Sequence, residues 1–306
     1  MAQTAQQLAQ QGYDKLSFFI LSGLPEGSEA GVDGKIWQVA AFEGFKFIPP
    51  GLHLFIVSAA PTSSSTPATI SGGVGVRHGL LRFFTTSETI VESWSNQREE
   101  FESDRPERIS KRRRTVPAPA AKVEGTVISQ DYLKSLDKKL AAYPPGLQSE
   151  WSLLTNFISP TTVARVVGFD EAGNAITDAV MGSTADEEEL KAAGGRQTWG
   201  KVREEGLETD LEEGDGEAVD ALAFVRVDGK KSWPEGARGE ELSRWSKDKS
   251  WQVSNIVKGQ LGGDVKELLS ELQLSFILFT LLHNFSSLAV YKVLFSLLSR
   301  SPTLLL

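Results

Sequence analysis

Short apolar runs separated by turn residues fill the first hundred residues of the chain, and they constrain the fold more than any other feature. There are six such runs: 16–21, 36–39, 45–48, 52–57, 80–84 and 89–94. Runs of this length bounded by Gly and Pro are typical of antiparallel strands, and none is followed by a long helical pattern. The pattern therefore predicts an antiparallel β-sandwich or barrel-like domain rather than a parallel α/β sheet.

Glycine and proline mark the ends of these runs. Pro25-Glu26-Gly27 follows the first run, and Pro49-Pro50-Gly51 separates the third from the fourth. Proline presets its own φ for a tight turn, and Gly51 can adopt the positive φ of the next turn position. Two longer segments, residues 61–75 and 98–123, are rich in Ser, Thr, Pro or charge, and we predict that they are flexible exposed loops.

Helical patterns replace the strands after residue 129. Leu133, Leu136 and Leu140 recur at helical spacing, and residues 143–146 (YPPG) end the pattern. A second helix is predicted around Trp151, and a third is predicted to begin at Pro160. These helices close a β-rich N-terminal domain over residues 13–170.

An acidic segment from residue 171 to residue 218 separates the two apolar parts of the chain. It contains 14 acidic and 4 basic residues, so its net charge is −10, whereas that of the whole chain is −8. With few large apolar side chains, it cannot bury enough surface to offset the entropy lost on ordering. We predict that it is a disordered linker.

Residues 219–306 are predicted to form an all-helical C-terminal domain, which makes the chain an α+β multidomain protein. After a strand-like run at 221–227, helical patterns cover 250–257, 265–282 and 285–298, and Asp264 is placed to cap the second of these helices. The last two helices are so apolar that further helices must cover them. We therefore expect this domain to be incomplete.

The apolar stretch Leu272–Leu298 leaves a membrane-associated adaptor open as an alternative. Gln273, His283, Asn284 and Lys292 interrupt it. No run reaches the roughly 18 uninterrupted apolar residues that a membrane span needs. A buried helical hairpin is the favoured interpretation.

The chain offers few residues for catalysis or metal binding. It has no cysteine, and none of its three histidines, His53, His78 and His283, has a second histidine at helical spacing. We predict no metal site, no cofactor and no enzyme activity. The net charge of −8 also argues against direct nucleic-acid binding. The alternative of a β-domain enzyme with an unrecognised site predicts a polar pocket near His53 or His78.

A short basic run lies within the second predicted loop. Lys111, Arg112, Arg113 and Arg114 are typical of a nuclear-import signal, although a solvated loop neutralised by nearby acidic residues is an alternative. Thr115 follows directly and suits a kinase that prefers basic residues. Phosphate there would cancel part of the positive charge.

The seven tryptophans fall into two groups. Trp37, Trp94 and Trp151 lie inside predicted ordered elements and are expected in the core. Trp199, Trp233, Trp245 and Trp251 surround the linker and its exit, where aromatic residues either anchor partners or pack the ends of the linker onto the domains.

Several longer stretches resemble the AAR2 family of splicing factors. The most specific are 24–33 (LPEGSEAGVD), 44–53 (GFKFIPPGLH), 151–158 (WSLLTNFI) and 271–276 (ELQLSF). Shorter matches occur at Trp37, 97–100, 136–137, 143–144, 234–237, 248–250, 281–284 and 298–301. The resemblance covers both apolar parts of the chain, omits the acidic segment and the basic run, and is lost after Ser301.

The resemblance implies a β-rich N-terminal domain, a helical C-terminal domain and a non-catalytic role in splicing. Members of this family bind the large scaffold protein of the U5 snRNP through its RNase-H-like and Jab/MPN-like domains. They hold off the particle's RNA helicase until maturation, move between cytoplasm and nucleus, and are thought to be released by phosphorylation. Within the matching stretch, Trp151, Asn156 and Phe157 are candidate partner-binding residues, with core packing the alternative for Trp151 and Phe157.

Overall fold

The structure, a computed structural model, describes residues 12–60, 76–102, 130–170, 172–178, 182, 222–228 and 233–304. The chain divides into two compact units, one of residues 1–179 with 280–283 and one of residues 180–279 with 284–306. The first unit is built mainly of strands and the second of helices. The predicted fold class, a β-rich domain followed by a helical one, is confirmed.

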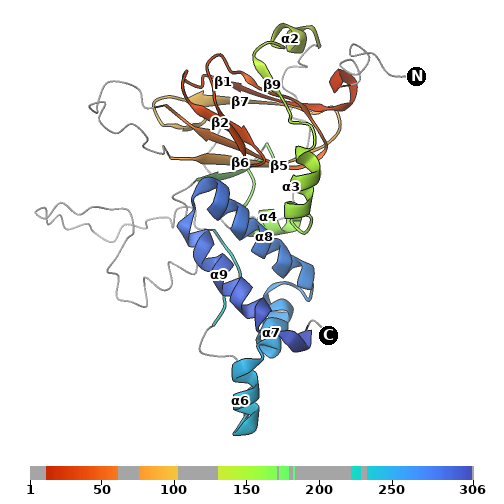
Figure 1. Ribbon diagram of the computed structural model, residues 1–306, viewed down its shortest axis with the longest axis vertical. Coiled ribbons are helices and arrows are strands. Elements are labelled where there is room, and N and C mark those ends of the chain that lie inside the picture. The colour runs from red at the N-terminus through yellow and green to blue at the C-terminus, as the bar shows by residue number, and fades with distance from the viewer. Residues whose placement is uncertain are drawn as a thin grey trace, which may run out of the picture. The chain divides into compact units, whose positions relative to one another are not determined.

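The first unit contains two five-stranded sheets that form two layers (Figure 1). One sheet has the order β8-β7-β1-β4-β9, and the other has the order β10-β6-β5-β2-β3. Most neighbouring strands are antiparallel, but β1 is parallel to β7 and β4 is parallel to β9. The strands are β1 (Ser17–Ser22), β2 (Glu29–Val32), β3 (Lys35–Gln38), β4 (Gly44–Ile48), β5 (Gly51–Ser58), β6 (His78–Phe84), β7 (Thr89–Ser95), β8 (Glu100–Phe101), β9 (Leu140–Ala142) and β10 (Ala175–Asp178).

Strand β1 is buried on both faces. Phe19 and Leu21 point into the core between the sheets, where the ring of Phe19 stacks on Phe55 of the other sheet at 4.2 Å between centroids. Phe18 and Ile20 point the other way and pack in a second cluster with Leu133, Leu136 and Leu140. This double burial explains why β1 is continuously apolar instead of alternating with polar residues.

The helix predicted to run from residue 129 to Tyr143 is shorter than expected. Helix α2 (Gln130–Ser135) ends before Leu140, which instead begins β9 and pairs with Gly44 of β4. Leu133, Leu136 and Leu140 still meet in one apolar cluster. Their spacing therefore reflects a shared burial site reached through a turn, not one continuous helix.

Strand β10 lies where the sequence predicted the start of the disordered linker. Ala175 and Thr177 are buried, and the strand pairs antiparallel with β6 along residues 78–81. The acidic composition of 171–218 hid this strand because only alternate residues of an edge strand need to be buried. The rest of the predicted linker, apart from residues 172–174 and 182, and the predicted loop 61–75 lie outside the described residues, as do residues 103–123 of the second loop.

The second unit is helical, as predicted. Its helices are α6 (Glu240–Lys247), α7 (Ser250–Gln260), α8 (Val265–Leu282) and α9 (Phe285–Ser299), with a short 3-10 turn at Pro302–Leu304. Asp264 accepts a hydrogen bond from the Lys266 amide at 2.8 Å, and Asn284 caps α9 by accepting from the Ser287 amide at 2.8 Å. None of the helices in the described part of the chain is long and apolar enough to cross a bilayer.

The strand predicted at residues 221–227 does not form. Within residues 222–228, the Val225 amide donates to Glu271 Oε2 at 2.8 Å, and Arg226 bonds to the side chain of Gln260. Side chains of α7 and α8 thus satisfy backbone groups that a neighbouring strand would otherwise satisfy.

Candidate protein-binding surfaces

His53, the residue around which the enzyme alternative predicted a pocket, is buried and fully hydrogen-bonded. Its Nδ1 lies 2.6 Å from Asp33 Oδ2, and its Nε2 lies 2.8 Å from the Pro49 carbonyl. Tyr143 donates its hydroxyl to Asp33 Oδ2 at 2.7 Å, and the Leu54 amide donates to Oδ1 at 2.9 Å. Both ring nitrogens of His53 face acceptors, so neither is left for a substrate.

The Asp33, His53 and Tyr143 network holds three parts of the first unit together. Asp33 lies in the turn between β2 and β3, His53 lies on β5, and Tyr143 follows β9. Burial, followed by the charge of Asp33, raises the pKa of Tyr143, which therefore remains a donor. The arrangement is that of a structural polar network rather than an acid–base pair open to solvent.

His78, the second histidine considered, is bound to strand β10. Its Nδ1 lies 2.5 Å from Asp178 Oδ1, and its ring packs against Trp94 at 5.2 Å between centroids. Across the residues that the structure describes, no group of three or more His, Asp or Glu is arranged to hold a metal ion.

A buried cluster around Arg82 fixes the start of β10. Arg82 donates to Asn174 Oδ1 at 2.8 Å and to Glu88 Oε1 at 2.5 Å, and Asn174 Nδ2 donates to Glu92 Oε1 at 2.9 Å. Burial works to raise the pKa of Glu88, but hydrogen bonds from Arg82 and Thr85 outweigh it, and the pKa is lowered. This cluster also has a structural role, since its charged groups bond to one another.

The candidate partner-binding stretch 151–158 divides into an inner and an outer side. Trp151 of α3 (Leu147–Thr155) is 4% exposed, and its Nε1 donates to the Leu52 carbonyl at 2.6 Å. Trp151 therefore fixes α3 on the sheet and offers no side-chain surface to a partner. Asn156 is exposed and Phe157 is half-buried, whereas Leu153, which the sequence analysis did not single out, is 76% exposed.

Helix α4 (Pro160–Val166) continues from this outer side. Ser159 caps it by accepting from the Thr162 amide at 3.0 Å, and Pro160 occupies its first turn, as predicted. The cap fixes where the chain turns directly after Phe157. Leu153, Asn156 and Phe157 thus belong to an ordered surface, which we call the α3 outer face.

In the second unit, two short stretches that carry the family resemblance lie together. Asp248 accepts from the amide and the hydroxyl of Ser250 at 2.9 Å and 2.5 Å, and Thr303 donates its hydroxyl to the same carboxylate. The Lys249 amide donates to the Arg300 carbonyl at 2.7 Å, and Arg300 Nη2 donates to the Ser246 carbonyl at 2.8 Å. Residues 248–250 and 298–301 therefore join the start of α7 to the end of α9.

Helix α9 carries three exposed large apolar side chains. Phe285, Val293 and Phe295 are 73%, 46% and 55% exposed, and the ring of Phe295 stacks on Tyr291 at 5.9 Å between centroids. Exposed Lys292 and Ser296 lie among them, so these residues do not form a continuous apolar surface.

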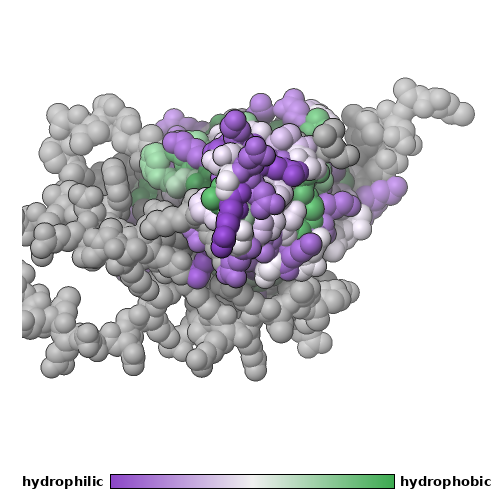
Figure 2. Space-filling view, turned by 90° about the horizontal axis from the view of Figure 1, so that it is seen from below, coloured by the Kyte–Doolittle hydropathy of each residue, from purple (hydrophilic) through white to green (hydrophobic). Residues whose placement is uncertain are grey.

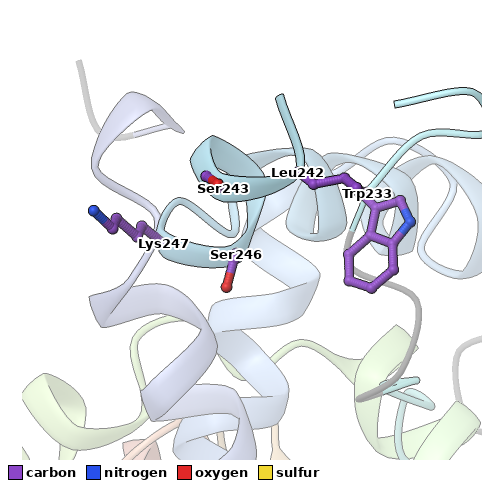
Figure 3. A pocket seen from close by; sticks show the side chains of 5 residues that line it. All are labelled: Trp233, Leu242, Ser243, Ser246 and Lys247. Atoms are coloured by element: carbon purple, nitrogen blue, oxygen red, sulfur yellow. The ribbon is translucent and has the colours of Figure 1, made fainter. Parts of the chain in front are cut away.

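A groove of about 400 Å³ lies beside α6 in the same unit, lined by Trp233, Leu242, Ser243, Ser246 and Lys247 (Figure 3). The indole of Trp233 stands at one end and the ammonium group of Lys247 points away at the other. At the end of the unit turned to the viewer in Figure 2, hydrophilic side chains predominate.

Two of the three tryptophans expected in the core are buried, and the predicted import signal and phosphorylation site cannot be placed. Trp94 and Trp151 are buried as expected, but Trp37 is 41% exposed because it lies on the edge strand β3. Lys111, Arg112, Arg113, Arg114 and Thr115 lie outside the described residues.

Comparison with known proteins accounts for both units. A sequence model of the AAR2 N-terminal domain matches residues 15–168, and one of the AAR2 C-terminal repeat region matches residues 224–306. The chain belongs to the AAR2 family.

Relatives of similar sequence occur in several animals. The chain is 29% identical to the Protein AAR2 homolog of Pongo abelii over 289 residues, which cover 92% of this chain and 68% of the relative. It is 28% identical to that of Mus musculus over 304 residues (97% and 72% covered), and 26% identical to that of Caenorhabditis elegans over 320 residues (95% and 73% covered). The AAR2 match therefore extends over nearly the whole chain.

Membership of the AAR2 family supports assigning the chain to the splicing-related factors. The names of these AAR2 relatives denote no enzyme activity. Among the described residues, the features best suited to such a role are the α3 outer face, the exposed apolar residues of α9 and the groove beside α6.

Proposed function

We propose that this AAR2-family chain is a non-catalytic assembly factor of the U5 snRNP. It binds the large scaffold protein of that particle, at the RNase-H-like and Jab/MPN-like domains, and holds off the RNA helicase until maturation. The observation that carries the proposal is the match of AAR2 sequence models to both folded units, at residues 15–168 and 224–306. Two units are what a factor needs to contact two domains of one partner.

The α3 outer face is the contact surface we assign to the first unit. Leu153 is 76% exposed on a helix that Trp151 fixes to the sheet, so an apolar side chain is presented from a rigid base. Asn156 and Phe157 border it and add an amide and an aromatic edge. Such a set resembles the small clusters that carry most of the energy of protein interfaces.

Because one chain segment joins the two units, both units can bind the same partner at once. When one unit is bound, the other is held near its own site, and its binding gains from a high effective concentration. The same arrangement permits stepwise release, because weakening one contact lowers the affinity of the whole chain. A placeholder that must leave before the helicase enters needs this property.

Transport and regulation belong to the same proposal. Lys111, Arg112, Arg113 and Arg114 form the proposed import signal for a protein that moves between cytoplasm and nucleus. Phosphorylation of Thr115 would place negative charge next to this run and weaken its recognition, or repel a nearby acidic contact.

The test is an affinity capture from cell extract with tagged residues 1–306, followed by mass spectrometry. We expect the scaffold protein of the U5 snRNP to be recovered without the helicase. Leu153→Glu should reduce this recovery about tenfold, since it places a charge in an apolar contact. Val91→Glu, at another exposed apolar residue of the first unit, is the matched control and should change recovery little.

Two results would overturn the proposal. One is a folded chain that recovers no scaffold protein, and the other is recovery of scaffold and helicase together in the same particle. Equal loss of capture in Leu153→Glu and Val91→Glu would remove the α3 outer face from the proposal and leave the assembly role.

A further inference from the structure

We infer that the groove beside α6 is a docking site for a short acidic segment of a partner protein, in which an apolar residue is followed by carboxylates. The groove lies in the second unit and is lined by Trp233, Leu242, Ser243, Ser246 and Lys247. This inference does not depend on the identity of the partner in the proposed function.

Helix α6 presents its side chains outward. None of the eight residues from Glu240 to Lys247 is buried, although the helix is strongly amphipathic. An isolated helix of this length is marginal in water, and it gains most of its stability when an apolar face is covered. Leu242 and the neighbouring Trp233, which is 39% exposed, form an apolar surface that the described residues leave open.

Positive charge gathers at the other end of the groove. Lys247 lines it although its ammonium group points outward (Figure 3), and Arg300 donates to the carbonyl of Ser246, another lining residue. Lys249 is close to Arg300, since its backbone amide donates to the Arg300 carbonyl at 2.7 Å. Among the described residues, Lys247, Lys249 and Arg300 form no salt bridge.

The acidic side chains near this end offset these cations only in part. Glu240 and Glu241 lie in the first turn of α6, at the end of the helix away from Lys247. The Asp248 carboxylate accepts hydrogen bonds from Ser250 and Thr303, which lower its pKa, so it keeps its negative charge. The groove therefore has an apolar end with an indole and an end at which Lys247, Lys249 and Arg300 outnumber the single carboxylate of Asp248.

These two ends define the occupant. A leucine- or phenylalanine-sized side chain fits against Trp233 and Leu242, and carboxylates that follow it reach the cations near the end of α6. RNA is disfavoured because the chain carries a net charge of −8 and the basic group is small.

The test measures fluorescence anisotropy of labelled ten-residue peptides on the full chain. One peptide has a Leu-Phe-Glu-Glu-Glu core, a second replaces each Glu by Gln, a third replaces each Glu by Lys, and the fourth probe is a 12-nucleotide oligo-uridine RNA. We expect the acidic peptide to bind at least about fivefold more tightly than the Gln peptide, with an affinity that falls as salt rises.

Variants that reverse the charge of single lysines test whether the peptide binds at the groove beside α6. Lys247→Glu should weaken the acidic peptide about tenfold and strengthen the Lys peptide. Lys258→Glu, at a lysine that is also exposed and lies in the last turn of α7, should leave both affinities within about twofold. The indole N–H signal of Trp233, assigned with Trp233→Phe, should shift when the acidic peptide is added.

Three outcomes would overturn the inference: equal binding of the acidic and Gln peptides, equal effects of Lys247→Glu and Lys258→Glu, or tighter binding of the RNA than of the acidic peptide. All of these measurements use defined peptides and no spliceosomal protein. A failure here is therefore distinct from a failure of the proposed assembly role.

Discussion

Gln260 pairs with both backbone groups of Arg226. Its Oε1 accepts from the Arg226 amide at 2.9 Å, and its Nε2 donates to the Arg226 carbonyl at 2.8 Å. The side-chain amide thus takes the place of a peptide group in a neighbouring strand. This pairing holds residues 222–228 against α7.

Replacing this amide should loosen the segment. We expect Gln260→Leu to lower the free energy of unfolding by about 1 kcal/mol, because both bonds are partly open to water and each contributes modestly. Amide hydrogen exchange at Arg226 should accelerate in the variant. Gln260→Glu, which keeps one acceptor and loses the donor, serves as the control and should give an intermediate effect; unchanged exchange at Arg226 would contradict the assignment.

Trp151 should matter for stability rather than for partner contact. Trp151→Phe removes the donor to the Leu52 carbonyl and leaves that buried group unsatisfied, which costs about 1–3 kcal/mol. Urea unfolding of the variant measures this loss. Ser152→Ala, at the exposed neighbouring position, should stay within about 0.5 kcal/mol of the original chain.

Two variants of the polar network around Asp33 should differ in how much stability they lose. Tyr143→Phe removes one of several hydrogen bonds to Asp33 and should cost about 1 kcal/mol. Asp33→Ala leaves His53 buried without its charged partner and should cost about 3–5 kcal/mol. Equal losses in the two variants, measured by chemical unfolding, would show that Asp33 does not organise this network.

The lowered pKa of Glu88 predicts how the free energy of unfolding depends on pH. Its pKa in the folded chain is lowered from the ordinary value of 4.5, so its contribution is fully present above pH 4.5 and is lost as the pH falls through the lower folded value. Unfolding by urea at pH 7, 5, 4 and 3 should show a steeper acid loss in the original chain than in Glu88→Gln. Glu26→Gln, at an exposed turn position, should keep the steep loss.

Features set by local chemistry could be predicted from the sequence. The bounds of α8 match the prediction, those of α9 match to within one residue, and Asp264 caps α8. Gly51 has a φ of +135°, a value that other residues rarely adopt. In each case the signal lies within a few residues of the feature that it determines.

Features set by distant partners could not be predicted. Leu140 continues a helical spacing, but its pairing with Gly44 makes it part of a strand. The run around Val225 resembles a strand, yet Glu271 and Gln260 satisfy its backbone. Leu153 could be recognised as an outward residue only after Trp151 had fixed the orientation of α3.

The double burial of β1 has a consequence for how that strand finds its place. Because β1 is apolar on both sides, polarity does not determine which of its faces lies inward. A shift of its register by one residue would still leave every large side chain buried. Close packing of the neighbouring backbones must therefore determine the register. A Cβ atom at Gly44 would lie 2.0 Å from the Phe19 carbonyl oxygen, so the neighbouring strand fits closely against β1 only where it has a glycine. Gly44 therefore fixes the register between β1 and β4. Its replacement should cause these strands to mispair, even though it removes no apolar surface.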